Sequence, residues 1–299
     1  MIRIPVLVLG ALTVAAVEQA APPVFRARAD VVVIEVAVMD QTSPVTGLTR
    51  DDFELRDNGV VQQLIDFDRA TLPLDVTLSI DISGSMTPVK REIVRRAVDR
   101  VNGALQPSDR VRIVTFGSHV AERVPLQAPP VAFTLSDVGD GTAVLDALLF
   151  SLVTSPVEGR RQLSLLMTDG NDTTSIVDAP TVLDTLKYAN SQLSFVITRS
   201  NEPSDGSFAG IRERRRLTME TLKTAAAWSG GRLVEIDRDD QLSEAFLSVI
   251  QGFRLSYVVR FAPEPSPAPG WHNVTVTVKD KRYMVRAKRG YWAGEPGNP

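Results

Sequence analysis

The middle of the chain alternates between short apolar runs and longer amphipathic segments. The runs "DVTLSI", "RVRIVTF", "RQLSLLMT" and "QLSFVIT" are aliphatic and β-branched, and they have the length of buried strands. Segments between them, such as "PVKREIVRRAVDRVNGAL" and "APTVLDTLKYAN", have apolar residues at helical spacing. In the first of these segments, six apolar residues share one predicted face: Val89, Ile93, Val94, Ala97, Val98 and Val101. The alternation from Leu74 to Gly252 predicts an α/β domain, a doubly wound and mostly parallel sheet with helices on both faces.

Both flanks of this segment have the pattern of strands alone. Residues 29–70 contain "DVVVIEVAVMD", an Asn-Gly turn and the alternating run "VQQLIDFD". Residues 253–293 contain "RLSYVVRF", "WHNVTVTVKD" and "YMVRAKRGYW". Each flank holds only two to four predicted strands, and an isolated hairpin is marginally stable in water. We therefore predict one small β-sandwich domain built from residues 29–70 plus 253–293, with residues 71–252 inserted into it as the α/β domain.

The N-terminus has the pattern of a targeting segment. Arg3 precedes the apolar run "IPVLVLGALTVAAV", and the small and proline-rich "EQAAPPV" follows it. The run is short for a membrane span but suits the core of a signal peptide, which we predict at residues 1–20, with a cut after Ala16 or Ala20. We therefore expect an exported protein, periplasmic, in the cell envelope or extracellular, with no membrane span after signal removal. A disordered or membrane-anchoring tail is the alternative.

Composition excludes several classes of site. The 299 residues carry a formal net charge of −3, so no basic excess indicates nucleic acid as a partner. The chain has no cysteine, which rules out disulfides, thiolate metal sites and cysteine nucleophiles. His119 and His272 are the only imidazoles, too few for a typical histidine-based zinc site and a weak basis for a Ser-His-Asp enzyme.

Oxygen-bearing side chains follow three of the predicted strands or turns. Asp81, Ser83 and Ser85 occupy alternate positions in "DISGSMTP", directly after a strand. Thr142 follows the turn "GDG", and Asp169 follows the strand "RQLSLLMT". In doubly wound sheets, ligands bind beyond the carboxyl ends of the strands, so these loops open onto one edge. Oxygen-only ligands suit a hard cation such as Mg²⁺.

Each of these residues also has a purely structural interpretation. Ser85 or Thr87 would serve as the N-cap of the following helix, and Asp169 would fit an Asp-Gly turn. Asp172 would either orient the waters of a metal or stabilise a turn. The basic run "IRERRR" at 211–216 is typical of a solvated face, and His119 of a surface turn.

The three loops together resemble the von Willebrand factor A domain family. "DISGSM" is similar to the first metal-binding loop of that family, "GDGTA" to its threonine loop and "LLMTDGND" to its aspartate loop. The resemblance implies a metal-ion-dependent adhesion site that holds Mg²⁺ or Mn²⁺ with Asp81, Ser83, Ser85, Thr142 and Asp169. The flanks "VTGLTRDDFELRDNGVVQQLIDFD" and "HNVTVTVKDKRYMVRAKRGYWA" look like those of a subgroup of exported bacterial proteins with such domains.

Three functions remain open at this stage. The first is an exported protein-binding and adhesion module that is not an enzyme, whose metal captures a Glu or Asp of a partner protein. The second is a metal-dependent hydrolase, but these motifs contain no spare His or Glu to act as a base. The third is an accessory partner of an AAA+ ATPase assembly, which export would disfavour. The chain itself has no G-x-x-x-x-G-K-[ST] loop.

Overall fold

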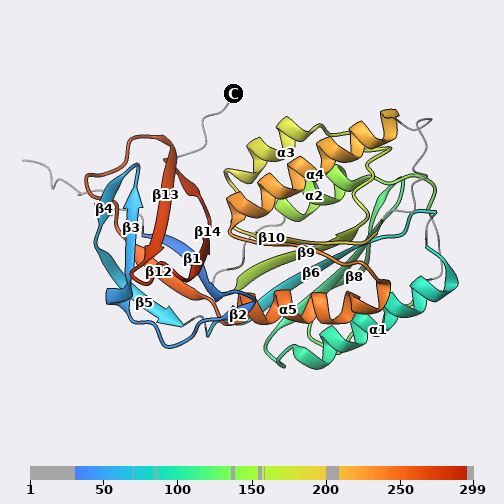
Figure 1. Cartoon of the computed structure of the whole chain (residues 1–299), viewed down its shortest axis with the longest axis horizontal. Coiled ribbons are helices and arrows are strands. Elements are labelled where there is room, and N and C mark those ends of the chain that lie inside the picture. Colours follow the sequence, from blue (N-terminus) through green and yellow to red (C-terminus); the bar gives the residue numbers. More distant parts are fainter. Residues whose placement is uncertain are drawn as a thin grey trace, which may run out of the picture.

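The computed structural model describes residues 31–69, 71–84, 86–135, 139–153, 157, 159–199 and 209–294. Within these residues, the alternating segment forms one sheet in the order β11-β10-β9-β6-β7-β8 (Figure 1). Neighbouring strands are parallel except β8, which is antiparallel to β7. The strands are β6 Leu74–Asp81, β7 Arg110–Phe116, β8 Val120–Gln127, β9 Arg161–Thr168, β10 Gln192–Ile197 and β11 Leu233–Glu235. The predicted α/β class is confirmed.

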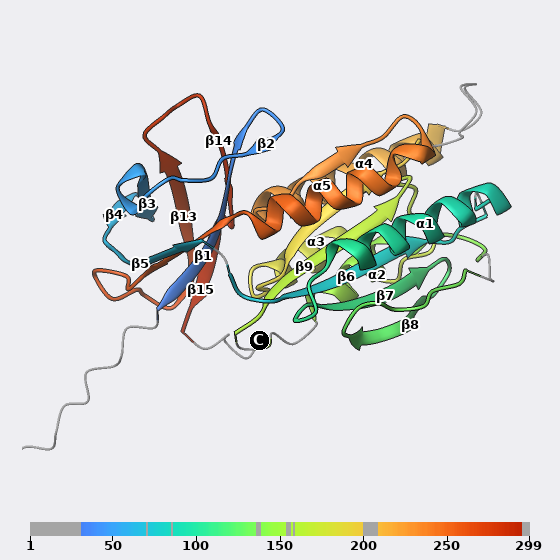
Figure 2. The same cartoon turned by 90° about the horizontal axis from the view of Figure 1, so that it is seen from below.

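Helices cover both faces of this sheet (Figures 1 and 2). On one face lie α1 (Pro88–Ala104) and α5 (Leu242–Arg254). On the other lie α2 (Val144–Leu152), α3 (Ala179–Leu186) and α4 (Ala209–Ser229). Every residue of β6 is buried, as expected for a strand that is covered on both sides.

The apolar face predicted for α1 is buried only after its first turn. Val94, Ala97, Val98 and Val101 are buried, whereas Val89 is 70% exposed. Periodicity gives the direction of a side chain, but not whether another element lies over it. The first turn of α1 lies at the loop edge of the sheet (Figure 2), and there Lys90 rather than Val89 faces a neighbouring segment, since it forms an ion pair with Asp239. The prediction that Val89 belongs to the buried face is therefore wrong.

Strands from both flanks form two further sheets that face each other. One has the order β14-β1-β12-β5, with β2 paired to β1, and the other has the order β15-β13-β3-β4. Apolar residues of both sheets, including Val36, Tyr257 and Val276, form a common core. The predicted β-sandwich is thus present. Its strands are β1 Val32–Asp40, β2 Ser43–Pro44, β3 Phe53–Asp57, β4 Val60–Gln62, β5 Leu64–Arg69, β12 Tyr257–Phe261, β13 Gly270–Val278, β14 Met284–Ala287 and β15 Gly290–Ala293.

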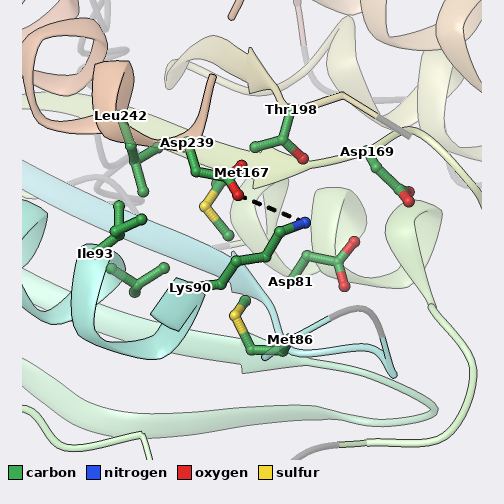
Figure 3. Close-up of a pocket in the computed structure, with 10 residues that line it drawn as sticks. Asp81, Met86, Lys90, Ile93, Met167, Asp169, Thr198, Asp239 and Leu242 are labelled. Carbon is green, nitrogen blue, oxygen red and sulfur yellow. Dashed lines mark ion pairs between the residues drawn. The ribbon is translucent and has the colours of Figure 1, made fainter. Parts of the chain in front are cut away.

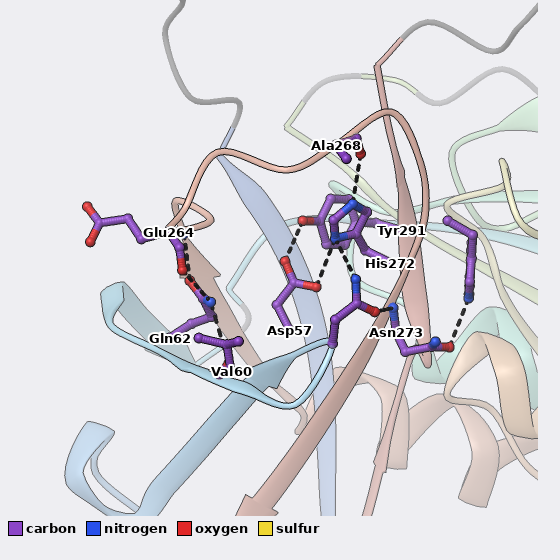
Figure 4. Close-up of polar contacts among 10 residues, drawn as sticks. Asp57, Val60, Gln62, Glu264, Ala268, His272, Asn273 and Tyr291 are labelled. Atoms are coloured by element: carbon purple, nitrogen blue, oxygen red, sulfur yellow. Dashed lines mark hydrogen bonds and ion pairs between the residues drawn. The ribbon is translucent and has the colours of Figure 1, made fainter.

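A buried polar cluster fastens the N-terminal flank to the C-terminal one (Figure 4). The carboxylate of Asp57, at the end of β3, accepts a 2.7 Å hydrogen bond from the Tyr291 hydroxyl and lies 3.1 Å from Nδ1 of His272. The side-chain oxygen of Asn58, in the tight turn between β3 and β4, accepts from the backbone N–H of Asn273 at 2.9 Å. His272, Asn273 and Tyr291 all come from the C-terminal flank, so the sandwich requires both ends of the described chain.

Arg161, the first residue of β9, joins the α/β domain to the sandwich. Its guanidinium is 3% exposed and makes two 3.0 Å hydrogen bonds to the carboxylate of Glu35, which lies in β1. It also donates to the Phe253 carbonyl and to the Ser256 hydroxyl, both at 2.6 Å. The guanidinium carbon lies 4.1 Å from the centre of the Phe253 ring. One side chain therefore ties together a central strand, the end of α5 and the first strand of the sandwich.

Aromatic pairs fill the rest of this seam. Trp228 of α4 stacks on Trp271 of β13 with ring centroids 6.3 Å apart. Tyr188 contacts Trp292 of β15 at 4.7 Å. The backbone N–H of Arg289 donates to the Trp228 carbonyl at 2.9 Å. Trp228, Trp271 and Trp292 therefore all pack at the seam between the α/β domain and the sandwich.

The predicted signal peptide, residues 1–20, lies outside the described residues. Among the helices that the structure does describe, none combines the length and the apolar character that a membrane crossing requires.

Candidate metal site

Asp81 ends the buried strand β6 at the loop edge of the sheet, and its side chain is buried although it carries an acid. It is 5% exposed. One carboxylate oxygen accepts a 2.9 Å hydrogen bond from the backbone N–H of Ser83, and the other accepts a 2.7 Å bond from the hydroxyl of Thr168. Within the described residues it forms no ion pair with a lysine, arginine or histidine. The two hydrogen bonds to this buried carboxylate thus come from neutral groups.

Burial raises the pKa of Asp81 to about 6, and the nearby charge of Asp169 adds to this rise. The hydrogen bonds from Ser83 and Thr168 act in the opposite direction, because they stabilise the charged form. The balance shows that two neutral donors do not compensate the removal of this carboxylate from water. A bound cation would supply the missing opposite charge.

The rest of the first loop turns from β6 into α1. Ser83 is partly buried, and its carbonyl accepts a 2.9 Å hydrogen bond from the N–H of Met86. Ser85 lies outside the described residues. Thr87 is the N-cap of α1, since its hydroxyl accepts from the N–H of Lys90 at 3.2 Å, and Pro88 follows it in the first turn. The sequence left open whether Ser85 or Thr87 caps this helix, and the structure assigns the N-cap to Thr87.

Hydrogen bonds draw the threonine loop onto the aspartate loop. Thr142 is 4% exposed. Its N–H donates to the Thr173 hydroxyl at 2.8 Å, and its carbonyl accepts from the N–H groups of Thr173 and Thr174 at 2.8 and 3.2 Å. Gly141 has φ +72, and a Cβ there would lie 2.6 Å from a methyl carbon of Thr174. Glycine is needed here for both conformation and space.

The same threonine loop also contacts the first loop. The N–H of Gly139 donates to the carbonyl of Ile82 at 2.8 Å, and the N–H of Ala143 donates to the carbonyl of Gly117 at 2.7 Å. A Cβ on Gly117 would lie 3.0 Å from the Cα of Gly139. These two glycines therefore permit a close approach between the threonine loop and the turn after β7, whose last residue, Phe116, pairs with Asp81 at the end of β6.

Asp169 begins the third loop, directly after β9. It is partly buried, and its carboxylate accepts from the backbone N–H of Asn171 at 3.0 Å and from the Asn171 side chain at 3.2 Å. Figure 3 shows the carboxylates of Asp81 and Asp169 at the mouth of a pocket between α1 and α5. Lys90 also lines this pocket and forms a 3.8 Å ion pair with Asp239.

The basic run at 211–216 is part of α4 and is not only a solvated face. Arg215 is partly buried, and its Nε donates a 2.9 Å hydrogen bond to the backbone carbonyl of Asp169. Gly170 has φ +85, and a Cβ there would lie 2.7 Å from the sulfur of Met219, one turn further along α4. The helix therefore holds the backbone of the aspartate loop. The spacing of the run could not reveal this, because Arg215 lies far from Asp169 in the sequence.

Asp172 links the aspartate loop to α2. Its carboxylate accepts from the N–H of Leu145 at 2.9 Å, from the N–H of Ser175 at 3.1 Å and from the Ser175 hydroxyl at 2.5 Å. These bonds give it a turn role and satisfy an N–H in the first turn of α2. An additional role in orienting metal-bound water stays a prediction.

The donor set fits a hard divalent cation. The set consists of the carboxylates of Asp81 and Asp169 and the hydroxyls of Ser83 and Thr142. All four side chains come from loops at one edge of the sheet. Throughout the described part of the chain, no group of three or more His, Cys, Asp or Glu side chains forms a conventional metal cluster. Oxygen donors with few carboxylates favour a cation that retains water, as Mg²⁺ does.

A doubly wound domain with hydroxyl and carboxylate loops at the carboxyl edge of its sheet defines a class of α/β ligand-binding domains. The model of one family in that class, the von Willebrand factor type A domain, matches residues 75–207. Residues 75–207 therefore match the von Willebrand factor type A domain, and the resemblance seen in the three loops is confirmed.

Comparison with solved structures gave remote likenesses. An aerotolerance-related membrane protein from Bacteroides fragilis NCTC 9343 is 18% identical, with 60% of this chain and 98% of that chain covered and a TM-score of 0.42. A von Willebrand factor type A protein from Catenulispora acidiphila is 14% identical, with 82% and 74% covered and a TM-score of 0.47.

The third is proximal thread matrix protein 1 from the mussel byssus, whose structure is described as having a zinc occupied MIDAS motif. It is 13% identical, with 66% of this chain and 49% of that chain covered and a TM-score of 0.48. Comparison with curated protein sequences found no match.

Proposed function

We propose that the protein is a metal-dependent binding module. Asp81, Ser83, Ser85, Thr142 and Asp169 would hold Mg²⁺ or Mn²⁺, and the site would bind a Glu or Asp side chain of a partner protein. The observation that carries this proposal is the buried carboxylate of Asp81, which forms no ion pair among the described residues, because Lys90 in the same pocket pairs with Asp239 instead. A charge removed from water needs a compensating charge, and the loop edge is where a cation can enter.

The chain's own residues explain why such a site would favour an acidic partner. The cation would supply positive charge and an open coordination position. Ser83 and Thr142 contribute neutral oxygens, so the donor set carries less negative charge than an all-carboxylate site of the same size. The hydrogen bonds that hold Thr142 and Asp169 fix the loops before the partner arrives, which lowers the entropic cost of binding.

The proposal assigns no enzymatic role to the protein. A hydrolase would need a general base near the metal, and His119 is the imidazole at this edge of the sheet. His119 is exposed, and its Nδ1 lies 2.8 Å from the hydroxyl of the adjacent Ser118. That geometry matches a surface turn residue, as the sequence predicted.

We further propose that the protein is exported and acts in the cell envelope or outside the cell. The apolar run after Arg3 supports this. Mass spectrometry of the N-terminus of the protein isolated from its source cells would test it. A mature N-terminus between residues 17 and 21 is expected, whereas an intact Met1 in a cytoplasmic fraction would reopen the ATPase-partner alternative.

The central test of partner binding uses an envelope extract with added Mg²⁺. Proteins captured by the wild-type chain should be released by EDTA, and their capture should return when Mg²⁺ is restored. Thr142→Ala should lose capture, because it removes a donor from a loop that backbone hydrogen bonds continue to hold. Thr275→Ala changes an exposed threonine of β13 in the sandwich and serves as the matched control. Capture that survives both EDTA and Thr142→Ala would contradict the proposal.

Hydrolase activity can be tested separately with p-nitrophenyl phosphate. No Mg²⁺-dependent hydrolysis above background is expected. Hydrolysis that is present in the wild type and absent in both Asp81→Asn and His119→Ala would replace the binding module with a metal-dependent hydrolase.

A further inference from the structure

Exposed aliphatic side chains flank the candidate metal site. Among the described residues, the two most exposed large apolar side chains are Ile176, at 94%, and Val89, at 70%. Ile176 lies in the aspartate loop and Val89 in the first turn of α1, so both belong to segments that lead away from the metal ligands. Single exposed apolar residues are common on protein surfaces, but these two extremes lie on the same edge of the domain.

The backbone that carries Ile176 is held in place. The N–H of Ile176 donates to both carboxylate oxygens of Asp146, at 3.0 and 3.1 Å, and the N–H of Val177 donates to the same carboxylate at 3.0 Å. Asp146 is in the first turn of α2, four residues after Thr142 in the sequence. The preceding Ser175 is held by Asp172. An ordered loop therefore presents the isoleucine to solvent, and hydrogen bonds tie that loop to the first turn of α2, which follows Thr142 in the chain.

Val89 lies on the other side of the first loop. It follows Thr87, the N-cap of α1, and Pro88, so the first turn that carries it is capped and its backbone is ordered. Lys90, the next residue, points back into the pocket toward Asp239 (Figure 3). The side chains of Val89 and Lys90 thus point in different directions, and that of Val89 faces the solvent.

We infer that Ile176 and Val89 form an apolar rim around the metal site, and that the rim selects partner segments in which the acidic residue is flanked by aliphatic or aromatic side chains. The inference rests on the proposed function and adds the chemistry of the partner to it. The occupant is a partner protein: the site itself calls for a carboxylate, and apolar groups next to that carboxylate would remove both rim residues from water on binding. Removing apolar surface from water in this way favours binding.

The β-sandwich cannot occupy this rim in the described chain. It lies at the opposite end of the α/β domain, against the start of β9 and the end of α5 (Figures 1 and 2). Among the described residues, the sandwich thus leaves the metal edge and the rim uncovered.

A peptide display library can test the rim directly. Peptides with a fixed central Asp or Glu and random flanking positions are selected on the full-length protein in Mg²⁺ and eluted with EDTA. The wild type should enrich aliphatic or aromatic residues within about three positions of the acid. Ile176→Asp should still select acid-containing peptides but lose this enrichment, and it should bind the best wild-type peptide at least about tenfold more weakly. Ile65→Asp changes an isoleucine of β5 that is 51% exposed, and it should behave as the wild type.

The outcomes separate this inference from the function on which it rests. Folding of Ile176→Asp is checked by its melting temperature, and Ile176→Val should restore most of the enrichment. Acidic peptides without apolar enrichment in the wild type would overturn the rim and leave the proposed function standing. Failure to obtain any EDTA-eluted acidic peptide would contradict both. Self-association in sedimentation that Ile176→Asp abolishes would overturn the partner segment in favour of a second copy of this chain.

Discussion

At the scale of single residues, Arg215 is the contact that connects a helix to the candidate metal site. The sequence showed five loop residues in the order and spacing of a metal site, because their motifs are local and directly follow strands. It could not show Arg215, whose hydrogen bond reaches from α4 to the Asp169 carbonyl. Nor could it show that Asp172 bonds the first turn of α2. Contacts between distant segments depend on packing that a local pattern does not encode.

Replacing Arg215 should weaken metal binding without unfolding the protein. Arg215→Met keeps the aliphatic stem but removes the Nε hydrogen bond that fixes the backbone of Asp169. A hydrogen bond from a charged group is worth about 1.5–3 kcal/mol, so a Kd for Mg²⁺ about tenfold weaker is expected by calorimetry. Arg214→Met, on an exposed neighbour in the same helix, is the control. Equal Mg²⁺ affinities in the two variants would show that Arg215 does not support the metal site and that the whole basic run is only a solvated face.

Lys288 should make stability depend on pH. Burial lowers the pKa of Lys288 to about 8, and the same group in the unfolded chain titrates near about 10.4. Between these values the unfolded state binds more protons, so the free energy of unfolding should rise with pH, by up to about 3 kcal/mol. The neutral amine can still donate to the Ala189 carbonyl and to Asn190.

The measurement compares urea unfolding of the wild type and Lys288→Met between pH 8 and 9.5. The difference in unfolding free energy between the two proteins should shift in favour of the wild type as pH rises. The range stops there because burial and the hydrogen bond to Asp57 raise the pKa of Tyr291, which lowers stability above about pH 10. A constant difference would show that Lys288 is not shifted.

At the scale of elements, periodicity predicted the strands and helices well where they are covered along their length. β6 is buried throughout and was predicted as a strand. The prediction failed at Val89, which is 70% exposed, because periodicity does not show which side of the first turn of α1 a neighbouring segment covers. The helix α4 begins at Ala209 and includes the charged run at 211–216, which has good intrinsic helix propensity and little apolar periodicity. Apolar periodicity therefore marks the part of a helix that packs against other elements. Intrinsic helix propensity can extend the helix beyond that part.

Removing Arg161 should strongly destabilise the seam between β9, α5 and β1. Arg161→Met leaves the carboxylate of Glu35 without its partner and removes hydrogen bonds to Phe253 and Ser256. Breaking a buried ion pair in this way costs about 3–5 kcal/mol. Chemical denaturation should show a loss of this size. Arg238→Met removes an exposed pair with Asp240 and should change stability by less than about 1 kcal/mol. If both variants lose only a similar small amount of stability, Arg161 does not hold the two domains together.

At the scale of the whole molecule, the two flanks meet where the α/β domain is inserted. Arg69, at the end of β5, is the register partner of Tyr257, at the start of β12. The chain thus leaves the sandwich and returns to it at neighbouring positions. The sequence predicted a shared sandwich because neither flank alone offered enough strands. The sequence could not predict the strand order or the stacking of Trp228 on Trp271.

The sandwich should fold only when both flanks are present. Residues 29–70 alone should give the amide spectrum of an unfolded chain, because β1, β3 and β5 would lose their partners β12 and β13. Residues 29–70 joined to 253–294 by a short Gly-Ser linker should give dispersed signals, since Arg69 and Tyr257 are already paired. Dispersed signals from residues 29–70 alone would contradict a single shared domain.

The melting temperature of the full-length protein with and without Mg²⁺ tests the metal site most directly. A cation that binds only the folded state adds about 2.7 kcal/mol at a hundredfold excess over its Kd. Wild-type protein freed of metal with EDTA should therefore melt at a clearly higher temperature once millimolar Mg²⁺ is restored. Asp81→Asn, which removes the buried charge but keeps an oxygen that can accept from Thr168 or Ser83, should melt at the same temperature in both conditions. A wild-type melt that Mg²⁺ does not change, or an equal rise in Asp81→Asn, would contradict the account.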